Sequence, residues 1–152
     1  MKEKNNTPKI IVAVLVVSFF LNLLWEVAHS LLYDWNDLPL QNTVQFYVPK
    51  ILMASLGDVM YVFIILLLLS LFRRGFIWIL NPKGRDYVSL IMWGILFAIF
   101  IEIKAETLGL WSYNSYMPLI FGIGLTPLIQ LAITSSVSLF IINNFMKGGN
   151  KR

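Results

Sequence analysis

The chain has 152 residues, of which 58% are hydrophobic and only 13% are charged, and its mean hydropathy is +0.74. Soluble globular domains carry about 25% charged residues, so this composition excludes an ordinary soluble domain and indicates a membrane protein. The chain contains no cysteine, which excludes disulfides and thiolate metal sites.

Four mainly apolar stretches are long enough to cross a bilayer as helices, at about residues 10–32, 51–72, 88–108 and 119–142. They lack the strict alternation of barrel strands. We therefore predict an all-α fold, a bundle of four transmembrane helices that forms one domain over residues 1–152. The first stretch also resembles a signal peptide with a cleavage site near Ala28-His29-Ser30. It is longer than a usual signal core, however, and we expect an uncleaved helix.

The basic residues predict how the bundle is oriented. All but two of the 12 lysines and arginines lie before the first stretch, between the second and third, or after the fourth; the exceptions are Lys50 and Lys104. Because basic loops stay in the cytoplasm, we predict a multi-pass protein of the cell membrane with both termini cytoplasmic. The net charge of +4 is spread over three segments, so we expect no nucleic-acid partner.

The connecting segments carry aromatic residues typical of a membrane–water interface. Trp35 lies in the first outer segment, residues 33–49. The apolar piece Phe76–Leu80 is too short to span, and we expect it to lie in the interface with Trp78 as an anchor. Pro118 suits the first turn of the last helix.

Polar side chains from all four stretches are predicted to lie at one level of the outer leaflet. At about 1.5 Å per helical residue, Glu26, Asp58 and Glu102 each lie about 10 Å below the outer end of their helix. Thr126 and Gln130 lie at similar depths. An ionised carboxylate at the bilayer centre costs about 2.5–3.5 kcal/mol, so these groups should face one another rather than lipid. We expect a polar pocket that opens to the outside.

Helical spacing places several of these groups on shared faces. Asn22, Glu26, His29 and Tyr33 follow the i, i+4, i+7, i+11 pattern of one stripe, and Glu102 and Glu106 share a face of the third helix. Asn22, Glu26 and His29 should therefore point into the bundle together.

The fourth stretch contains residues that allow close packing. We expect Pro127 to kink this helix beside Gln130, and Gly122-Ile123-Gly124 to let a neighbouring helix approach closely. Gln130, Thr134 and Ser135 fit hydrogen bonds between helices better than contacts to a ligand. A purely structural role of the polar layer therefore stays open.

Two classes of function fit the polar layer. An enzyme would bind a membrane lipid or isoprenoid that enters sideways, with Glu26 or Asp58 as proton donor and Glu102 as base, helped by His29. The residues expected to bind that ligand are Asn22, Trp25, Trp93, Glu106, Trp111 and Gln130. A non-catalytic protein would use the same groups to transport protons, ions or small molecules, or to hold a partner helix. Transport by so small a chain would require a homo-oligomer.

Metal chemistry has weak support in the sequence. Glu26-x-x-His29 matches half of the di-iron carboxylate motif, which needs a second such pair and two further glutamates. The chain has a single histidine, so we expect no metal site and no cofactor.

Residues 105–130, AETLGLWSYNSYMPLIFGIGLTPLIQ, resemble a segment of lycopene-cyclase-type membrane domains of carotenoid synthesis. The matching positions are an acidic residue, a Gly-x-Trp-x-aromatic segment and a proline, namely Glu106, Gly109, Leu110, Trp111, Ser112, Tyr113 and Pro127. Where that family has a carboxylate pair after the proline, this chain has Leu128-Ile129-Gln130. The resemblance implies a redox-neutral, proton-driven rearrangement of an isoprenoid. The chain resembles small four-helix prokaryotic membrane proteins equally well.

Overall fold

The computed structural model describes residues 7–34 and 43–149, except for the side chains of residues 43–47 and 148–149. Trp35 lies outside this range. In chain order the elements are α1 (Thr7–His29), η1 (Ser30–Leu32), α2 (Thr43–Phe72), η2 (Phe76–Leu80), α3 (Gly84–Leu108), β1 (Leu119–Ile120), β2 (Ile123–Gly124) and α4 (Leu125–Gly149). Four of these helices are long and apolar enough to cross a membrane. The predicted bundle of four such helices is confirmed.

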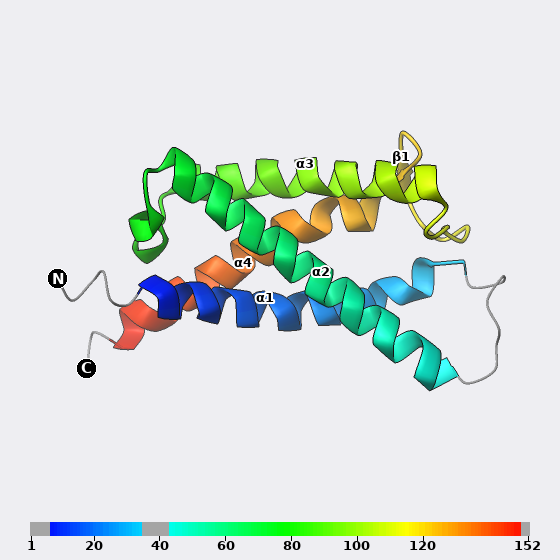
Figure 1. Ribbon diagram of the computed structural model, residues 1–152, viewed down its shortest axis with the longest axis horizontal. Coiled ribbons are helices and arrows are strands. Elements are labelled where there is room, and N and C mark those ends of the chain that lie inside the picture. The colour runs from blue at the N-terminus through cyan, green and yellow to red at the C-terminus, as the bar shows by residue number, and fades with distance from the viewer. Residues whose placement is uncertain (1–6, 35–42, 150–152) are drawn as a thin grey trace.

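The four helices run side by side between two different ends of the molecule (Figure 1). The start of α1, the end of α4 and the 3-10 helix η2 lie at one end, which we call the terminal end. The β1–β2 hairpin and the 3-10 turn η1 lie at the other, which we call the distal end. Helix α3 packs mainly against α4, and α1 packs against α2 and α4. Helix α2 crosses obliquely, from α3 at the terminal end to α1 at the distal end (Figure 1).

Helix α1 buries polar residues and exposes apolar ones. Its buried face repeats every three or four residues and includes Ser18, Asn22 and Glu26. Phe20 and Leu24, on the opposite face, are 57% and 68% exposed. A water-soluble helix has the reverse pattern, with its apolar side chains inside. This distribution leaves an apolar surface around a partly polar interior.

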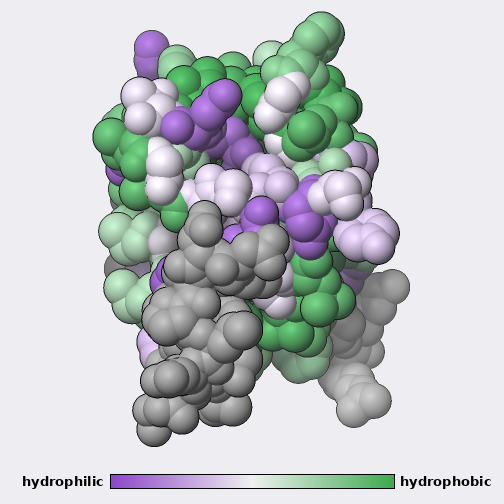
Figure 2. All heavy atoms as spheres, turned by 90° about the vertical axis from the view of Figure 1, so that its right-hand side faces the viewer, coloured by the Kyte–Doolittle hydropathy of each residue, from purple (hydrophilic) through white to green (hydrophobic). Residues whose placement is uncertain are grey.

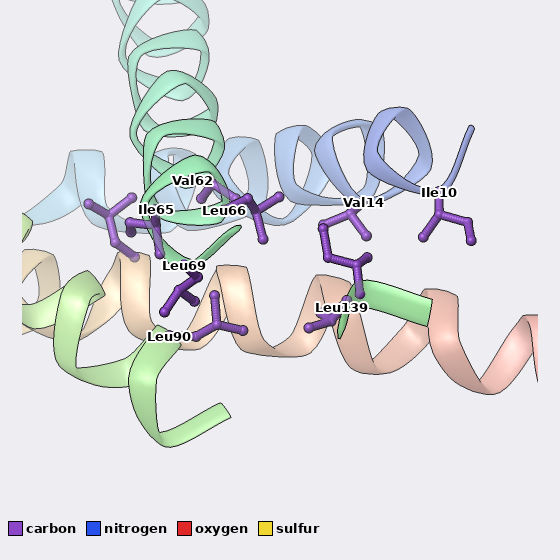
Figure 3. Close-up of a cluster of buried hydrophobic side chains, with 10 residues drawn as sticks. Ile10, Val14, Val62, Ile65, Leu66, Leu69, Leu90 and Leu139 are labelled. Atoms are coloured by element: carbon purple, nitrogen blue, oxygen red, sulfur yellow. The ribbon is translucent and has the colours of Figure 1, made fainter. Parts of the chain in front are cut away.

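A hydrophobic cluster fills the bundle toward the terminal end (Figure 3). Its buried side chains come from all four helices and from η2: Ile10, Val14, Val62, Ile65, Leu66, Leu69, Ile79, Leu90, Leu131 and Leu139. The short segment η2 closes this end of the cluster, because Ile79 is fully buried and its carbonyl accepts a hydrogen bond from the Asn143 amide at 2.9 Å. Trp78 lies beside it and donates its indole N–H to Ser70 Oγ at 3.0 Å.

Helices α3 and α4 approach each other most closely at Gly94. A Cβ atom added to Gly94 would lie 2.6 Å from both Cα and N of Ala132. Ala98, one turn further along α3, is also buried. Small residues four apart on one helix face let two backbones come together in this way. The close approach of the two backbones therefore explains why residue 94 is a glycine, and helix propensity does not.

The fourth helix begins at Leu125, so the expected start near residue 119 is wrong. Residues 119–124 form a short β-hairpin. Its two-residue turn consists of Phe121 and Gly122, which both have positive φ (51° and 84°). Such a turn needs positive φ at both central positions. Leu125 N–H donates to the Pro118 carbonyl at 2.8 Å, which places Pro118 before the hairpin.

The expected kink at Pro127 is absent for the same reason. Pro127 is the third residue of α4, and backbone N–H groups in a first helical turn have no partner within the helix. Proline therefore breaks no hydrogen bond there. At Gly124 an added Cβ would lie 3.1 and 3.0 Å from the Tyr113 and Pro127 side chains, and helix α3 also approaches here, since the Gly124 backbone N–H donates to Glu102.

Candidate functional site

A cavity of about 700 Å³ lies between the helices toward the distal end, and we call it the distal cavity. Residues of α1, α2, α3, α4 and the segment after α3 line it. Helices α2 and α3 diverge toward this end of the molecule (Figure 1). Figure 2 views this end of the molecule, where hydrophilic residues gather in the middle and hydrophobic residues surround them. The polar residues that line the distal cavity include Glu26, His29, Asp58, Glu102 and Gln130.

The Gln130 side chain connects three helices at the inner wall of the distal cavity. Its amide nitrogen donates to Asp58 Oδ2 at 2.7 Å and to Glu26 Oε1 at 2.8 Å, and lies 3.3 Å from Asn22 Oδ1. Asn22 is itself fixed on α1, because its amide donates to the Ser18 carbonyl at 2.9 Å. Gln130 reaches this position from the second turn of α4, so the late start of that helix decides where its amide lies.

Glu102 is held by a separate chain of hydrogen bonds. The Trp111 indole N–H donates to the Tyr113 hydroxyl at 2.9 Å, and that hydroxyl donates to Glu102 Oε1 at 2.8 Å. Helix α3 ends at Leu108, and the left-handed conformation of the following Gly109 (φ 60°) turns the chain back over Glu102. Burial raises the pKa of the Tyr113 hydroxyl, and the nearby Tyr33 and Glu102 raise it further. Tyr113 therefore remains a donor at neutral pH.

The segments after α1 and after α3 pair with each other at the distal end. Tyr33 and Tyr113 form an isolated antiparallel bridge, Asp34 N–H donates to the Ser112 carbonyl at 2.9 Å, and Asn114 N–H donates to the Leu32 carbonyl at 3.0 Å. The Tyr33 and Tyr113 rings stack with centroids 5.4 Å apart. Burial is also the main cause that raises the pKa of the Tyr33 hydroxyl. This pairing forms an aromatic cover beside the carboxyl groups.

His29 is almost fully buried at the edge of the distal cavity. It is 2% exposed, and neither Nδ1 nor Nε2 has a partner among the residues that the structure describes. Its ring lies 4.7 Å from that of Tyr33 and 5.9 Å from that of Tyr113, measured between centroids. Buried polar groups in proteins are nearly always hydrogen-bonded, so an unpartnered imidazole beside a cavity requires an explanation.

A second hollow of about 510 Å³ lies between α1 and α4 and is nearly all apolar; we call it the side groove. Leu21, Leu24 and Trp25 of α1 face Ile133 and Val137 of α4 across it. His29 lines both the side groove and the distal cavity.

The structure brings together most of the residues predicted from the sequence. Glu26, His29, Asp58, Glu102, Trp111 and Gln130 all line the distal cavity, and Asn22 lies directly behind it. The predicted burial of Glu26 and His29 is confirmed, at 6% and 2% exposure. Gln130 makes the predicted hydrogen bonds between helices and also reaches the cavity.

Three predicted residues lie elsewhere. Glu106 is exposed and does not line the cavity, because it lies on the last turn of α3, although it shares the helix face of the buried Glu102. Trp25 lines the side groove instead. Trp93 packs against Phe72 and Phe97, with ring centroids 6.4 and 6.1 Å away.

Sequence reasoning gave no site role to three tyrosines. Tyr33 and Tyr61 line the distal cavity, and Tyr113 orients Glu102. Helical spacing does predict that Tyr33 shares the stripe of Asn22, Glu26 and His29, at i+11.

No group of three histidine, cysteine or acidic side chains that could hold a metal ion occurs among residues 7–34 and 43–149. No protein-family model, curated protein or solved structure matches this chain.

Proposed function

We propose that this chain is a multi-pass membrane protein whose distal cavity binds a lipid or isoprenoid and exchanges protons with it. Both termini would lie in the cytoplasm and the distal cavity in the outer half of the membrane. The observation that carries the proposal is the gathering of Glu26, His29, Asp58 and Glu102 around one cavity of about 700 Å³. That volume is typical of sites for small organic molecules.

The membrane part of the proposal is supported by surface chemistry and charge. Four helices are long and apolar enough to cross a bilayer. Large apolar side chains cover their outer faces, as Phe20 and Leu24 do on α1. The basic residues Arg73, Arg74 and Lys83 belong to the α2–α3 connection, at the terminal end, which the positive-inside rule assigns to the cytoplasm.

The binding part is supported by the lining of the two hollows. Apolar residues such as Ile51, Ile101 and Leu131 contribute most of the distal cavity's surface, with carboxyl groups among them. The side groove adds an apolar surface on the other side of His29. An amphipathic molecule could place its chain against these surfaces and its reactive or polar group beside the carboxyls.

Acid–base chemistry needs one group that gives a proton and one that takes it. Glu26 and Asp58 share the Gln130 amide, and a proton on either could pass to a carbon–carbon double bond of the ligand. Glu102, on the opposite wall, could remove a proton from a neighbouring carbon. The double bond would move without oxidation or reduction. The resemblance of residues 105–130 to lycopene-cyclase-type domains implies the same kind of rearrangement.

Cysteine labelling tests the orientation, since the native chain has no cysteine. Ser115 at the distal end and Asn81 at the terminal end are both exposed. A membrane-impermeant maleimide should label Ser115→Cys in intact cells and Asn81→Cys only after the cells are permeabilised. The reverse pattern would contradict cytoplasmic termini.

Mass spectrometry of co-purifying molecules tests the binding function. The protein solubilised in mild detergent should carry an apolar organic molecule at close to one per chain. Glu26→Gln should lose or alter that molecule, because the substitution removes a titratable oxygen from the cavity wall. Glu106→Gln, which removes an exposed carboxyl from α3, is the matched control and should retain it. Metal content would be measured on the same samples.

One outcome of this measurement would contradict the proposal. If the wild-type protein is empty and Glu26→Gln only lowers its unfolding temperature, the polar cluster is structural. The alternative of helix-mediated assembly with a partner would then be favoured over ligand chemistry.

A further inference from the structure

The carboxyl cluster of the distal cavity offers more hydrogen-bond acceptors than its amide can satisfy. The Gln130 amide nitrogen has two hydrogens, yet three acceptor atoms lie within 3.3 Å of it, on Asn22, Glu26 and Asp58. Each carboxyl group also has a second oxygen. Glu102, which also lines the cavity, already accepts hydrogen bonds from the Tyr113 hydroxyl and the Gly124 backbone N–H. A ligand that complements this wall must bring hydrogen-bond donors.

His29 points to the same requirement independently. Its ring is almost fully buried and lines the cavity, and both of its nitrogens lack partners among the residues that the structure describes. A neutral imidazole has one acceptor nitrogen, and leaving a buried polar atom unsatisfied costs stability. A donor on a bound molecule would satisfy it.

The rest of the lining indicates a positively charged group. Three carboxyl groups on three helices face one cavity, and the rings of Tyr33, Tyr61 and Trp111 line it as well. Carboxylates with aromatic faces are the combination that binds organic ammonium groups. Lys50 and Lys104 also line the cavity, and both side chains are exposed.

The spacing of the acidic groups favours an organic cation over a metal ion. Among residues 7–34 and 43–149, no three acidic or histidine side chains lie close enough together to hold a metal. The cavity is also far larger than one ion, at about 700 Å³, and mostly apolar, with Ile51, Ala54 and Leu110 in its wall. These features fit a primary ammonium group on an apolar chain, which brings three N–H donors and a hydrocarbon body.

We propose that the distal cavity recognises the primary ammonium group of an amphipathic amine, with Glu26 and Asp58, the two carboxyl groups that share the Gln130 amide, as its charged acceptors and His29 beside them. This inference rests on the proposed ligand-binding function and names the chemical class of the ligand. Two sources carry that group: a free long-chain amine, and a phospholipid with an amino headgroup. In the second case Lys50 and Lys104 would lie at the mouth of the cavity, near the phosphate.

Titration of the detergent-solubilised protein with three probes of equal chain length tests the proposal. The probes are dodecylamine, dodecanol and dodecyltrimethylammonium, followed by Trp fluorescence and by the unfolding temperature. Dodecylamine should bind about tenfold or more tightly than dodecanol, because charge-assisted hydrogen bonds form only with the amine. The quaternary probe has the charge without N–H donors and should bind more weakly than dodecylamine.

Paired variants connect the binding to the acceptors. Asp58→Asn should weaken dodecylamine binding about tenfold and leave dodecanol binding unchanged, whereas Glu106→Gln should change neither. Glu26→Gln is a second, near-isosteric test should Asp58→Asn fail to fold. Reconstitution in nanodiscs identifies the source. Phosphatidylethanolamine that competes with dodecylamine, where phosphatidylcholine does not, would indicate the lipid, and competition by neither would indicate a free amine.

The two proposals fail in different ways. Equal binding of dodecanol and dodecylamine, insensitive to Asp58→Asn, would overturn the ammonium inference and leave a cavity for neutral lipids. Binding of none of the three probes would overturn both proposals.

Discussion

Replacing Gly94 by alanine should lower the free energy of unfolding by about 3 kcal/mol, the upper part of the range for overpacked cores. The added Cβ would meet Cα and N of Ala132 at 2.6 Å and the carbonyl carbon of Leu131 at 2.9 Å. These are backbone atoms, so no change of rotamer can relieve the overlap. Helices α3 and α4 would have to separate along their main contact. Thermal or denaturant unfolding in detergent would measure the loss.

Gly57→Ala is the matched control for this prediction. Gly57 also lies within a helix, α2, but nothing lies within 4 Å of an added Cβ. Alanine is the better helix former by about 1 kcal/mol, so this variant should be as stable as the parent or slightly more so. Equal stability of Gly94→Ala and the parent would show that α3 and α4 are not in contact at Gly94.

Replacing Gln130 by leucine should cost about 3–5 kcal/mol of stability, because two carboxyl groups lose their shared donor at once. The amide nitrogen lies 2.7 Å from Asp58 Oδ2 and 2.8 Å from Glu26 Oε1. Leucine cannot donate a hydrogen bond to either carboxyl group. Three helices meet at this side chain, so the loss should extend to α1, α2 and α4 together. Unfolding measurements on the single variant would give its size.

A double variant separates this effect from a simple change of shape. Adding Glu26→Gln to Gln130→Leu places an amide donor on α1, within reach of Asp58, and should restore about 1–3 kcal/mol. Ser136→Ala removes an α4 hydroxyl that has no hydrogen-bond partner among the described residues, and should change stability by less than about 0.5 kcal/mol. Strictly additive costs of Gln130→Leu and Glu26→Gln would mean that the two side chains do not interact.

The inward direction of the polar side chains could be predicted from their helical spacing and from the free-energy cost of placing them in lipid. Asn22, Glu26 and His29 lie on one stripe of an otherwise apolar helix, and a carboxyl group in contact with hydrocarbon is expensive. Only one rotation of α1 avoids that cost, and it is the rotation observed. Asp58 and Gln130 meet Glu26 because the polar residues of neighbouring helices lie at similar depths.

The distal turn and the pairing of Tyr33 with Tyr113 could not be predicted in the same way. Leu119, Ile120 and Ile123 are as apolar in a hairpin as in a helix, so hydropathy cannot tell the two apart. The Tyr33–Tyr113 bridge joins segments that are distant along the chain, and neither carries a local strand pattern. Gly94 was missed because one glycine in an apolar helix reveals close packing only when the neighbouring helix is known.

The position of His29 bears on where the proposed ligand would come from. This residue lines both hollows, so its imidazole ring borders the side groove and the distal cavity. A rotation of that ring would join the two spaces. In the proposed membrane setting, a hydrophobic molecule could then reach the carboxyl groups without passing through water. The fraction of protein with ligand bound would then depend on the concentration of the ligand in the bilayer. A compound whose solubility in buffer is too low for a binding measurement could still saturate the protein.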